Sequence, residues 1–248
     1  MKKYIPNTIT LLNLLSGSIG IVYAINGELR VASWLVGLAA IFDFLDGFAA
    51  RLLNVKSEIG KELDSLADVI SFGLLPGTII YSMLWLNPGT PQITISDNNI
   101  FPFIGLLIPV FSAIRLAKFN IDQRQTYFFL GLPTPANGLL IASFPLILIQ
   151  NSNLIGTDLV FYKSLINSSY FLISLVVLLC WLLISEIPLM SLKFKTMQWK
   201  GNELRYTFVG TLLILLILLN VAAVPLIVLL YILLSLIFPD SVKGGIST

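Results

Sequence analysis

The chain has 248 residues, of which 56% are hydrophobic and only 11% are charged. That charged fraction is less than half of the roughly 25% found in ordinary globular proteins, so it excludes a typical soluble domain. The net charge of +2 is too small to indicate nucleic acid binding. The chain has no histidine and one cysteine, Cys180, which excludes an intrachain disulfide and leaves oxygen atoms as the ligands for any metal.

Long uncharged runs recur along the chain, at residues 4–27, 69–96, 98–114, 125–157, 164–185 and 206–239. Several of these exceed the approximately 20 residues that cross the hydrocarbon core of a bilayer. The sequence therefore predicts an all-α, multi-pass integral membrane protein.

In chain order, the predicted helices cover residues 5–26, 29–53, 60–86, 101–121, 134–150 and 164–185. Pro76 and Gly77 predict a kink in the third helix. The last run, 206–239, would be ~51 Å long as one helix. We therefore expect a two-helix hairpin with its turn between Asn220 and Pro225, which gives eight spans, or seven without the turn.

The basic residues predict the orientation. With the N-terminus in the cytoplasm, all of the 15 Lys and Arg residues except Arg30 and Lys163 lie on the cytoplasmic side. The positive-inside rule therefore predicts a cell-membrane protein with both termini in the cytoplasm. Segment 186–205 carries several cations and is expected to lie at the interface near anionic headgroups; they are Lys193, Lys195, Lys200 and Arg205.

Four aspartates interrupt the second and third predicted helices, at Asp43, Asp46, Asp64 and Asp68. A carboxylate at membrane depth costs roughly 3 kcal/mol, so it normally faces a partner or a cavity. The first two lie three residues apart and the last two four apart, so each pair shares one helix face. Because a short link makes the two helices antiparallel neighbours, we expect the pairs to meet at the cytoplasmic end.

Four carboxylates this close need cations, because like charges oppose each other's ionisation. Two divalent ions would neutralise them and hold the oxygens of a diphosphate. Small residues on the same faces, Gly47, Ala50 and Gly60, leave room for a large ligand, and Arg51 can pair with a phosphate. Two alternatives are a polar seam between packed helices and a cation transporter. Clustering near one interface disfavours transport.

These residues resemble the signature of the CDP-alcohol phosphatidyltransferase family, D-x2-D-G-x2-A-R-x8-G-x3-D-x3-D. Every fixed position matches: Asp43, Asp46, Gly47, Ala50, Arg51, Gly60, Asp64 and Asp68. The resemblance implies a catalytic membrane domain of six helices over residues 1–185. The interfacial segment 186–205 and the added helices and tail at 206–248 would follow it. It also implies a homodimer.

The resemblance further implies the chemistry. All four aspartates would bind two divalent ions, Mg2+ or Mn2+, and Asp68 would also be the general base. Gly47, Ala50 and Arg51 would bind the CDP-lipid, with Asp46 and Gly60. Asn7, Thr10 and Asn13 share one face of the first predicted helix at the level of the aspartates. We expect these three to bind cytidine or phosphate; the alternative is polar helix packing.

Three further stretches resemble the phosphatidylserine synthase branch of the family: PNTITLLNLLSG at 6–17, IRLAKFN at 114–120 and GLPTPANG at 131–138. The branch implies CDP-diacylglycerol and L-serine as substrates, with phosphatidylserine and CMP as products. Arg115, Lys118 and Asn120 are the expected acceptor-binding residues, although the branch usually has Arg in place of Lys118. The alternatives are another acceptor, such as glycerol 3-phosphate, and a role for the two cations as membrane anchors only.

Overall fold

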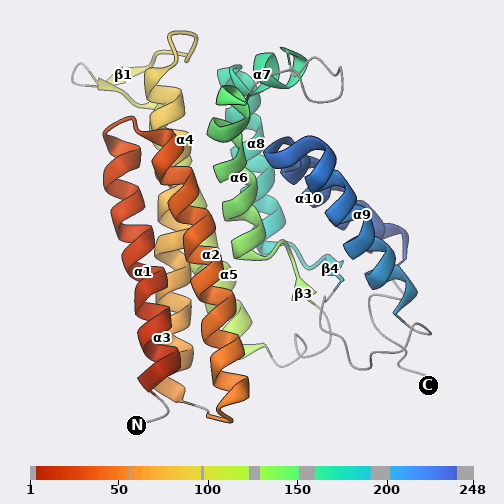
Figure 1. The fold of residues 1–248 in the computed structure, drawn as a ribbon. Coiled ribbons are helices and arrows are strands. Elements are labelled where there is room, and N and C mark those ends of the chain that lie inside the picture. The colour runs from red at the N-terminus through yellow and green to blue at the C-terminus, as the bar shows by residue number, and fades with distance from the viewer. Residues whose placement is uncertain are drawn as a thin grey trace.

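A computed structural model describes residues 4–55, 57–95, 98–122, 129–150, 160–190 and 202–238. Across these residues the chain is helical, apart from two antiparallel ribbons of two-residue strands, β1–β2 (Thr94–Ile95 and Asn98–Asn99) and β3–β4 (Phe129–Leu130 and Pro188–Leu189). Most helices run alongside one another as a bundle, and α9 and α10 lie at its side (Figure 1). The predicted all-α architecture is confirmed.

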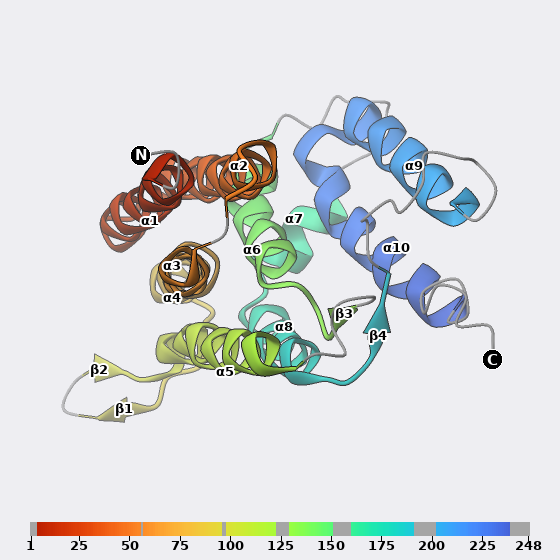
Figure 2. The ribbon, with the colours of Figure 1, turned by 90° about the horizontal axis from the view of Figure 1, so that it is seen from below.

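The first half of the chain forms two adjacent antiparallel passes and a third that lies beside this pair (Figures 1 and 2). Its helices are α1 (Tyr4–Ile25), α2 (Leu29–Leu52), α3 (Glu58–Asp68), the π-helical segment η1 (Val69–Leu74) and α4 (Leu75–Leu86). Gly27, at a φ of 81°, makes the turn between α1 and α2. Ser57 caps α3 by accepting a hydrogen bond from the Gly60 N–H at 3.2 Å. In the third pass, the departure from α-helical geometry is the π-helical segment η1, which ends before Pro76.

The second half contains η2 (Phe101–Leu106), α5 (Leu107–Ile121), α6 (Thr134–Ile149), α7 (Val160–Ile166) and α8 (Ser169–Ile184). The prediction of one straight helix over 164–185 is wrong, because α7 and α8 meet at 73°. Ser168 accepts a hydrogen bond from the Phe171 N–H and so starts α8 afresh after the break.

The C-terminal region forms the predicted hairpin. It consists of α9 (Glu203–Leu219), the 3-10 turn η4 (Asn220–Ala222) and α10 (Ala223–Ile237). Length and composition alone count 203–237 as a single apolar stretch of 35 residues. The ring centroids of Phe208 and Tyr231 nevertheless lie 5.9 Å apart, whereas 23 residues of straight helix would separate them by about 35 Å. The chain therefore reverses at η4, where Asn220 has a φ of 50°.

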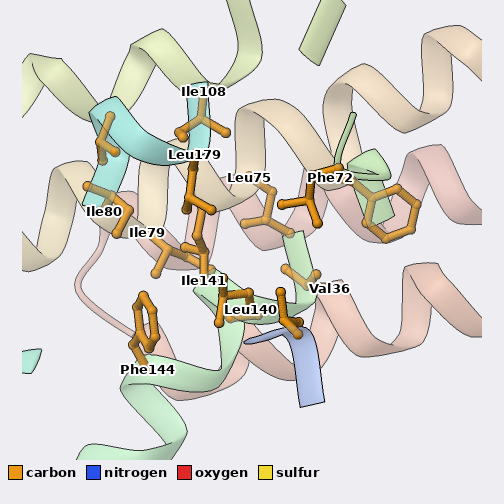
Figure 3. Close-up of a cluster of buried hydrophobic side chains, with 14 of the residues drawn as sticks. Val36, Phe72, Leu75, Ile79, Ile80, Ile108, Leu140, Ile141, Phe144 and Leu179 are labelled. Atoms are coloured by element: carbon orange, nitrogen blue, oxygen red, sulfur yellow. The ribbon is translucent and has the colours of Figure 1, made fainter. Parts of the chain in front are cut away.

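A hydrophobic core joins the two halves of the bundle (Figure 3). It draws side chains from α2, α4, α5, α6 and α8, including Val36, Leu75, Ile79, Ile108, Leu140, Ile141 and Leu179. Close backbone packing adds to it where α4 meets η2, since a Cβ on Gly77 would lie 2.7 Å from the Gly105 carbonyl oxygen. The bundle thus holds the ends of α2, α3 and α5 in fixed relation.

Among the described residues, five helical stretches are long and apolar enough to cross a membrane, or six when α7 and α8 count as one span. The chain is therefore an integral membrane protein. The prediction of eight full spans is too high by this measure, because α6 has only 16 residues and the hairpin helices only 17 and 15.

Candidate active site

Three carboxylates from two helices meet near one end of the bundle. Carboxylate oxygens of Asp43 on α2 and of Asp64 and Asp68 on α3 all lie within 4.8 Å of one another. Asp68 is 7% exposed, and its buried Oδ1 has no hydrogen-bond partner. Carboxylates packed this closely repel one another when ionised, so a bound cation would stabilise the cluster.

The fourth aspartate faces α1. Asp46 is also 7% exposed, and its Oδ2 accepts a hydrogen bond of 2.7 Å from the Thr10 hydroxyl. It lies within electrostatic range of the other three carboxylates. The structure thus brings all four predicted aspartates to one level, with three forming the tight cluster and Asp46 beside it.

The donor set fits divalent ions that prefer oxygen. Carboxylate oxygens are the ligands that Mg2+ and Mn2+ take, and the cluster contains neither nitrogen nor sulfur donors. Oδ1 of Asp68 has no hydrogen-bond partner, so its lone pairs are available to coordinate such an ion. The residues present therefore fit the predicted metal.

Beside these carboxylates lies a cavity of about 670 Å³ between α1, α2 and α3, which we call the first cavity. Seven of the predicted metal-binding and CDP-lipid-binding residues line it: Asn7, Thr10, Asp46, Gly47, Ala50, Gly60 and Asp64. Arg51 is exposed and lies one turn beyond Gly47. Asn13 is fully buried and approaches the Asp68 carboxylate, at a geometry short of a full hydrogen bond.

Two glycines shape the first cavity in different ways. A Cβ on Gly60 would lie 2.8 Å from Asn7 Oδ1, so glycine permits α3 to approach α1. A Cβ on Gly47 would meet only Arg51 Nη1, at 4.0 Å. The space that Gly47 leaves is therefore free for a ligand.

A second cavity, of about 350 Å³, lies at the end of α5. Its charged lining residues are Arg115, Lys118, Asp122 and Glu186. Arg115 is 6% exposed and donates from Nη1 to the Thr134 hydroxyl at 3.2 Å, while its Nε has no partner. Such a buried guanidinium is not a surface anchor, and its unpartnered N–H calls for an anion.

The other two predicted acceptor residues differ from Arg115. Lys118 lines the second cavity but is exposed. Asn120 is absent from the lining of that cavity and joins α5 to α3 instead. Its side-chain amide donates to the Ser65 hydroxyl at 2.9 Å, and its backbone carbonyl accepts from Lys61 Nζ at 3.1 Å. Asn120 therefore fixes the spacing of two helices that carry the site.

Asp68 lines neither cavity but interacts electrostatically with one residue of each. Its carboxylate lies within electrostatic range of Asp64, which lines the first cavity, and of Arg115, which lines the second. Directly after Asp68 the chain forms η1, whose Ser71 donates to the Asn13 carbonyl at 3.0 Å. A π-helical segment at this place is typical of functional sites.

Several residues near the two cavities were not predicted from the sequence. Lys61 lines the first cavity as a cation, and Glu186 lines the second as an acid. Ser112 and Asn137 are fully buried with unpartnered side-chain atoms, one turn from Arg115 and from its partner Thr134 respectively. The signal for Asn137 was an amide inside an apolar helix. Nothing local in the sequence distinguished Glu186.

Comparison with known proteins gives a consistent result. The chain matches the family described as CDP-alcohol phosphatidyltransferase over residues 3–239. It is 35% identical to a CDP-diacylglycerol–serine O-phosphatidyltransferase of Helicobacter pylori over 196 residues, which cover 78% of this chain and 74% of the relative. A protein of the same name from Bacillus subtilis is 36% identical over 148 residues, covering 57% of this chain and 76% of the relative.

A third relative has a different name. An archaetidylserine synthase of Methanothermobacter thermautotrophicus is 36% identical over 143 residues, which cover 55% of this chain and 57% of the relative. The family match extends over nearly the whole chain and includes the helices that carry the carboxylates. The chain therefore belongs to the CDP-alcohol phosphatidyltransferase family.

Proposed function

We propose that this enzyme transfers the phosphatidyl group of CDP-diacylglycerol to the hydroxyl of L-serine, giving phosphatidylserine and CMP. The observation that carries the proposal is the carboxylate cluster of Asp43, Asp64 and Asp68, whose oxygens lie within 4.8 Å of one another at the edge of a cavity lined by Asp46 and Asp64. The first cavity takes the CDP-lipid and the second takes the alcohol. Family membership sets aside the alternative of a cation transporter.

Beside the first cavity, Asp43, Asp46, Asp64 and Asp68 would hold two divalent ions, Mg2+ or Mn2+. When bound, these ions supply the positive charge that stabilises the diphosphate and the departing CMP. Thr10 orients Asp46 through its hydrogen bond. Asn7, Gly47, Ala50, Arg51 and Gly60, with Asn13 behind them, bind the cytidine and phosphate groups.

Asp68 acts as general base. The serine hydroxyl oxygen forms a bond to the lipid phosphorus, the bond from that phosphorus to the CMP oxygen breaks, and the hydroxyl proton moves to the Asp68 carboxylate. The unpartnered Oδ1 of Asp68 supports this role, because it has a lone pair free to accept the proton. With no histidine in the chain, a carboxylate is the available base.

The charges of the second cavity favour an amino acid as the acceptor. L-Serine carries a carboxylate and an ammonium group, and the cavity offers two cations, Arg115 and Lys118, together with two acids, Asp122 and Glu186. Arg115 would bind the carboxylate and Glu186 the ammonium group. Glycerol 3-phosphate has no ammonium group for the acids to bind, and its phosphate would be repelled by them. The two relatives described as serine O-phosphatidyltransferases support the same acceptor.

The charge distribution supports an active site that faces the cytoplasm. Arg30 lies at the start of α2 and Lys163 lies in α7, and both positions are at the end of the bundle opposite the link from α2 to α3 (Figure 1). Arg51 lies at the end of α2, next to that link, and Lys61 lies in the first turn of α3. Lys118 lies in the last turn of α5 and lines the second cavity with Arg115. The basic segment around Lys193, Lys195 and Lys200 is outside the described residues.

Release of CMP by the purified protein tests the function. Detergent-solubilised protein with CDP-diacylglycerol and Mn2+ is given L-serine, glycerol 3-phosphate, myo-inositol or no alcohol. We expect CMP and phosphatidylserine with L-serine, and loss of both on chelation of the metal. CMP release with glycerol 3-phosphate but not with L-serine would overturn the assignment of the acceptor.

A further inference from the structure

One wall of the second cavity is a strand ribbon and the end of α8. Leu130 of β3 and the residues 183–186 line it. The Gly131 N–H donates to the Ile187 carbonyl at 3.0 Å, and the Leu132 N–H donates to the Leu182 carbonyl at 2.9 Å. Backbone hydrogen bonds therefore fix Glu186 and its neighbours to the segment that precedes α6.

The C-terminal hairpin holds this ribbon from its other side. Ser235 Oγ accepts a hydrogen bond of 3.0 Å from the Met190 N–H, and the Tyr231 hydroxyl donates one of 2.8 Å to the Met190 carbonyl. Both α10 side chains are buried, at 1% and 8% exposed. Two side chains one turn apart thus bind both backbone groups of the residue directly after β4.

Tyr231 also approaches the substrate side of the wall. It lies within electrostatic range of the Arg115 guanidinium, and its ring packs on Phe208 of α9. Tyr231 therefore contacts α9, the other helix of the hairpin, and Met190 at the end of β4. It also comes near Arg115, the buried cation of the second cavity.

We propose that α10 is a positioning element of the acceptor site. Tyr231 and Ser235 hold Met190, and so keep β4 and Glu186 at a fixed distance from Arg115. The hairpin is then part of the machinery that selects the alcohol, rather than an addition to the catalytic bundle. The identity of the alcohol as L-serine and the use of the second cavity as its site rest on the proposed function; the hold of α10 on Met190 does not.

Two single-atom deletions test this role, Tyr231→Phe and Ser235→Ala. Each leaves one buried backbone group of Met190 without its partner, which loosens the wall. We expect the KM for L-serine to rise about tenfold, the factor that corresponds to one lost hydrogen bond of this kind. The KM for CDP-diacylglycerol should stay within twofold of the wild-type value.

Thr211→Val is the matched control. It also removes a hydroxyl from the hairpin, but that hydroxyl bonds only within α9, to the Thr207 carbonyl at 2.9 Å. We expect this variant to keep both KM values. A KM for serine that is unchanged in both α10 variants, or a parallel rise in both KM values, would overturn the positioning role.

Hydrogen–deuterium exchange supplies a readout that does not depend on activity. Amides of 186–190 should exchange faster in Tyr231→Phe than in wild type or in Thr211→Val, and equal exchange would contradict the proposal. If wild-type protein uses an alcohol other than L-serine, the KM comparison is made with that alcohol. Failure of the proposed function and failure of the α10 role are thus separate results.

Discussion

The two cavities are built in different ways. The first cavity takes its charged and small residues from α1 and from one segment of 26 residues, 43–68, on two helices that are neighbours in sequence. The second takes its residues from α5, β3 and the end of α8, and α10 stabilises it. One short sequence motif can therefore supply the residues that bind a diphosphate through metal ions. Recognition of the alcohol depends on residues from several parts of the bundle.

The largest expected effect is on Asp68, the buried member of the carboxylate cluster. Asp68→Asn keeps the shape of the side chain but cannot accept the proton, so we expect turnover to fall by about 100-fold or more. Binding of CDP-diacylglycerol should be largely retained, as measured by titration in the presence of Mn2+. Glu62→Gln, an exposed acid on α3, is the control and should keep wild-type turnover. Near-normal turnover in Asp68→Asn would mean that another group is the base.

Replacement of Arg115 should affect only the second cavity. Arg115→Lys keeps the charge but loses the planar fork and the bond to Thr134. We expect the KM for L-serine to rise by about tenfold or more, with little change in the KM for CDP-diacylglycerol. Lys118→Gln should give a smaller rise, because Lys118 is exposed. A larger effect at Lys118 than at Arg115 would reverse their assigned importance.

Gly47→Ala should affect only the first cavity. The added methyl group meets no protein atom closer than 4.0 Å, and alanine favours the helix by about 0.5–1 kcal/mol over glycine. The melting temperature should therefore stay equal or rise. The KM for CDP-diacylglycerol should nevertheless rise several-fold, because the methyl group occupies ligand space. An unchanged KM would show that the CDP-lipid lies elsewhere.

The smallest effect is expected at Glu186, which is exposed. Glu186→Gln removes a charge contact to the ammonium group that is worth about 1 kcal/mol or less at such a site, which corresponds to a rise of up to about fivefold in the KM for L-serine. Preference for L-serine over 3-hydroxypropanoate, which lacks the ammonium group, should fall by the same factor. Glu28→Gln, at the opposite end of the bundle, should alter neither value. An unchanged preference would remove Glu186 from acceptor recognition.

The sequence was sufficient for the first cavity for a physical reason. Residues spaced three or four apart on a helix share a face, and a short link brings two such faces together. Asp43 and Asp68 could therefore be placed near each other without coordinates. The hairpin at Asn220 was likewise predictable, because a run of its length does not fit one membrane crossing.

The second cavity could not be derived in this way. Glu186 and Arg115 line the same cavity only because α8 ends beside α5 and because a ribbon joins segments some 60 residues apart. Asn120 lies only two residues after Lys118, yet its side chain donates a hydrogen bond to Ser65 on α3. The break between α7 and α8 also depends on a local cap at Ser168 that hydropathy does not report.

The most direct test of separate substrate cavities is a kinetic comparison of wild type, Gly47→Ala and Arg115→Lys, with each substrate varied at saturating levels of the other. Separate cavities predict that Gly47→Ala raises only the KM for CDP-diacylglycerol and that Arg115→Lys raises only the KM for L-serine. A rise in both KM values in either variant would contradict the division of the site into two cavities.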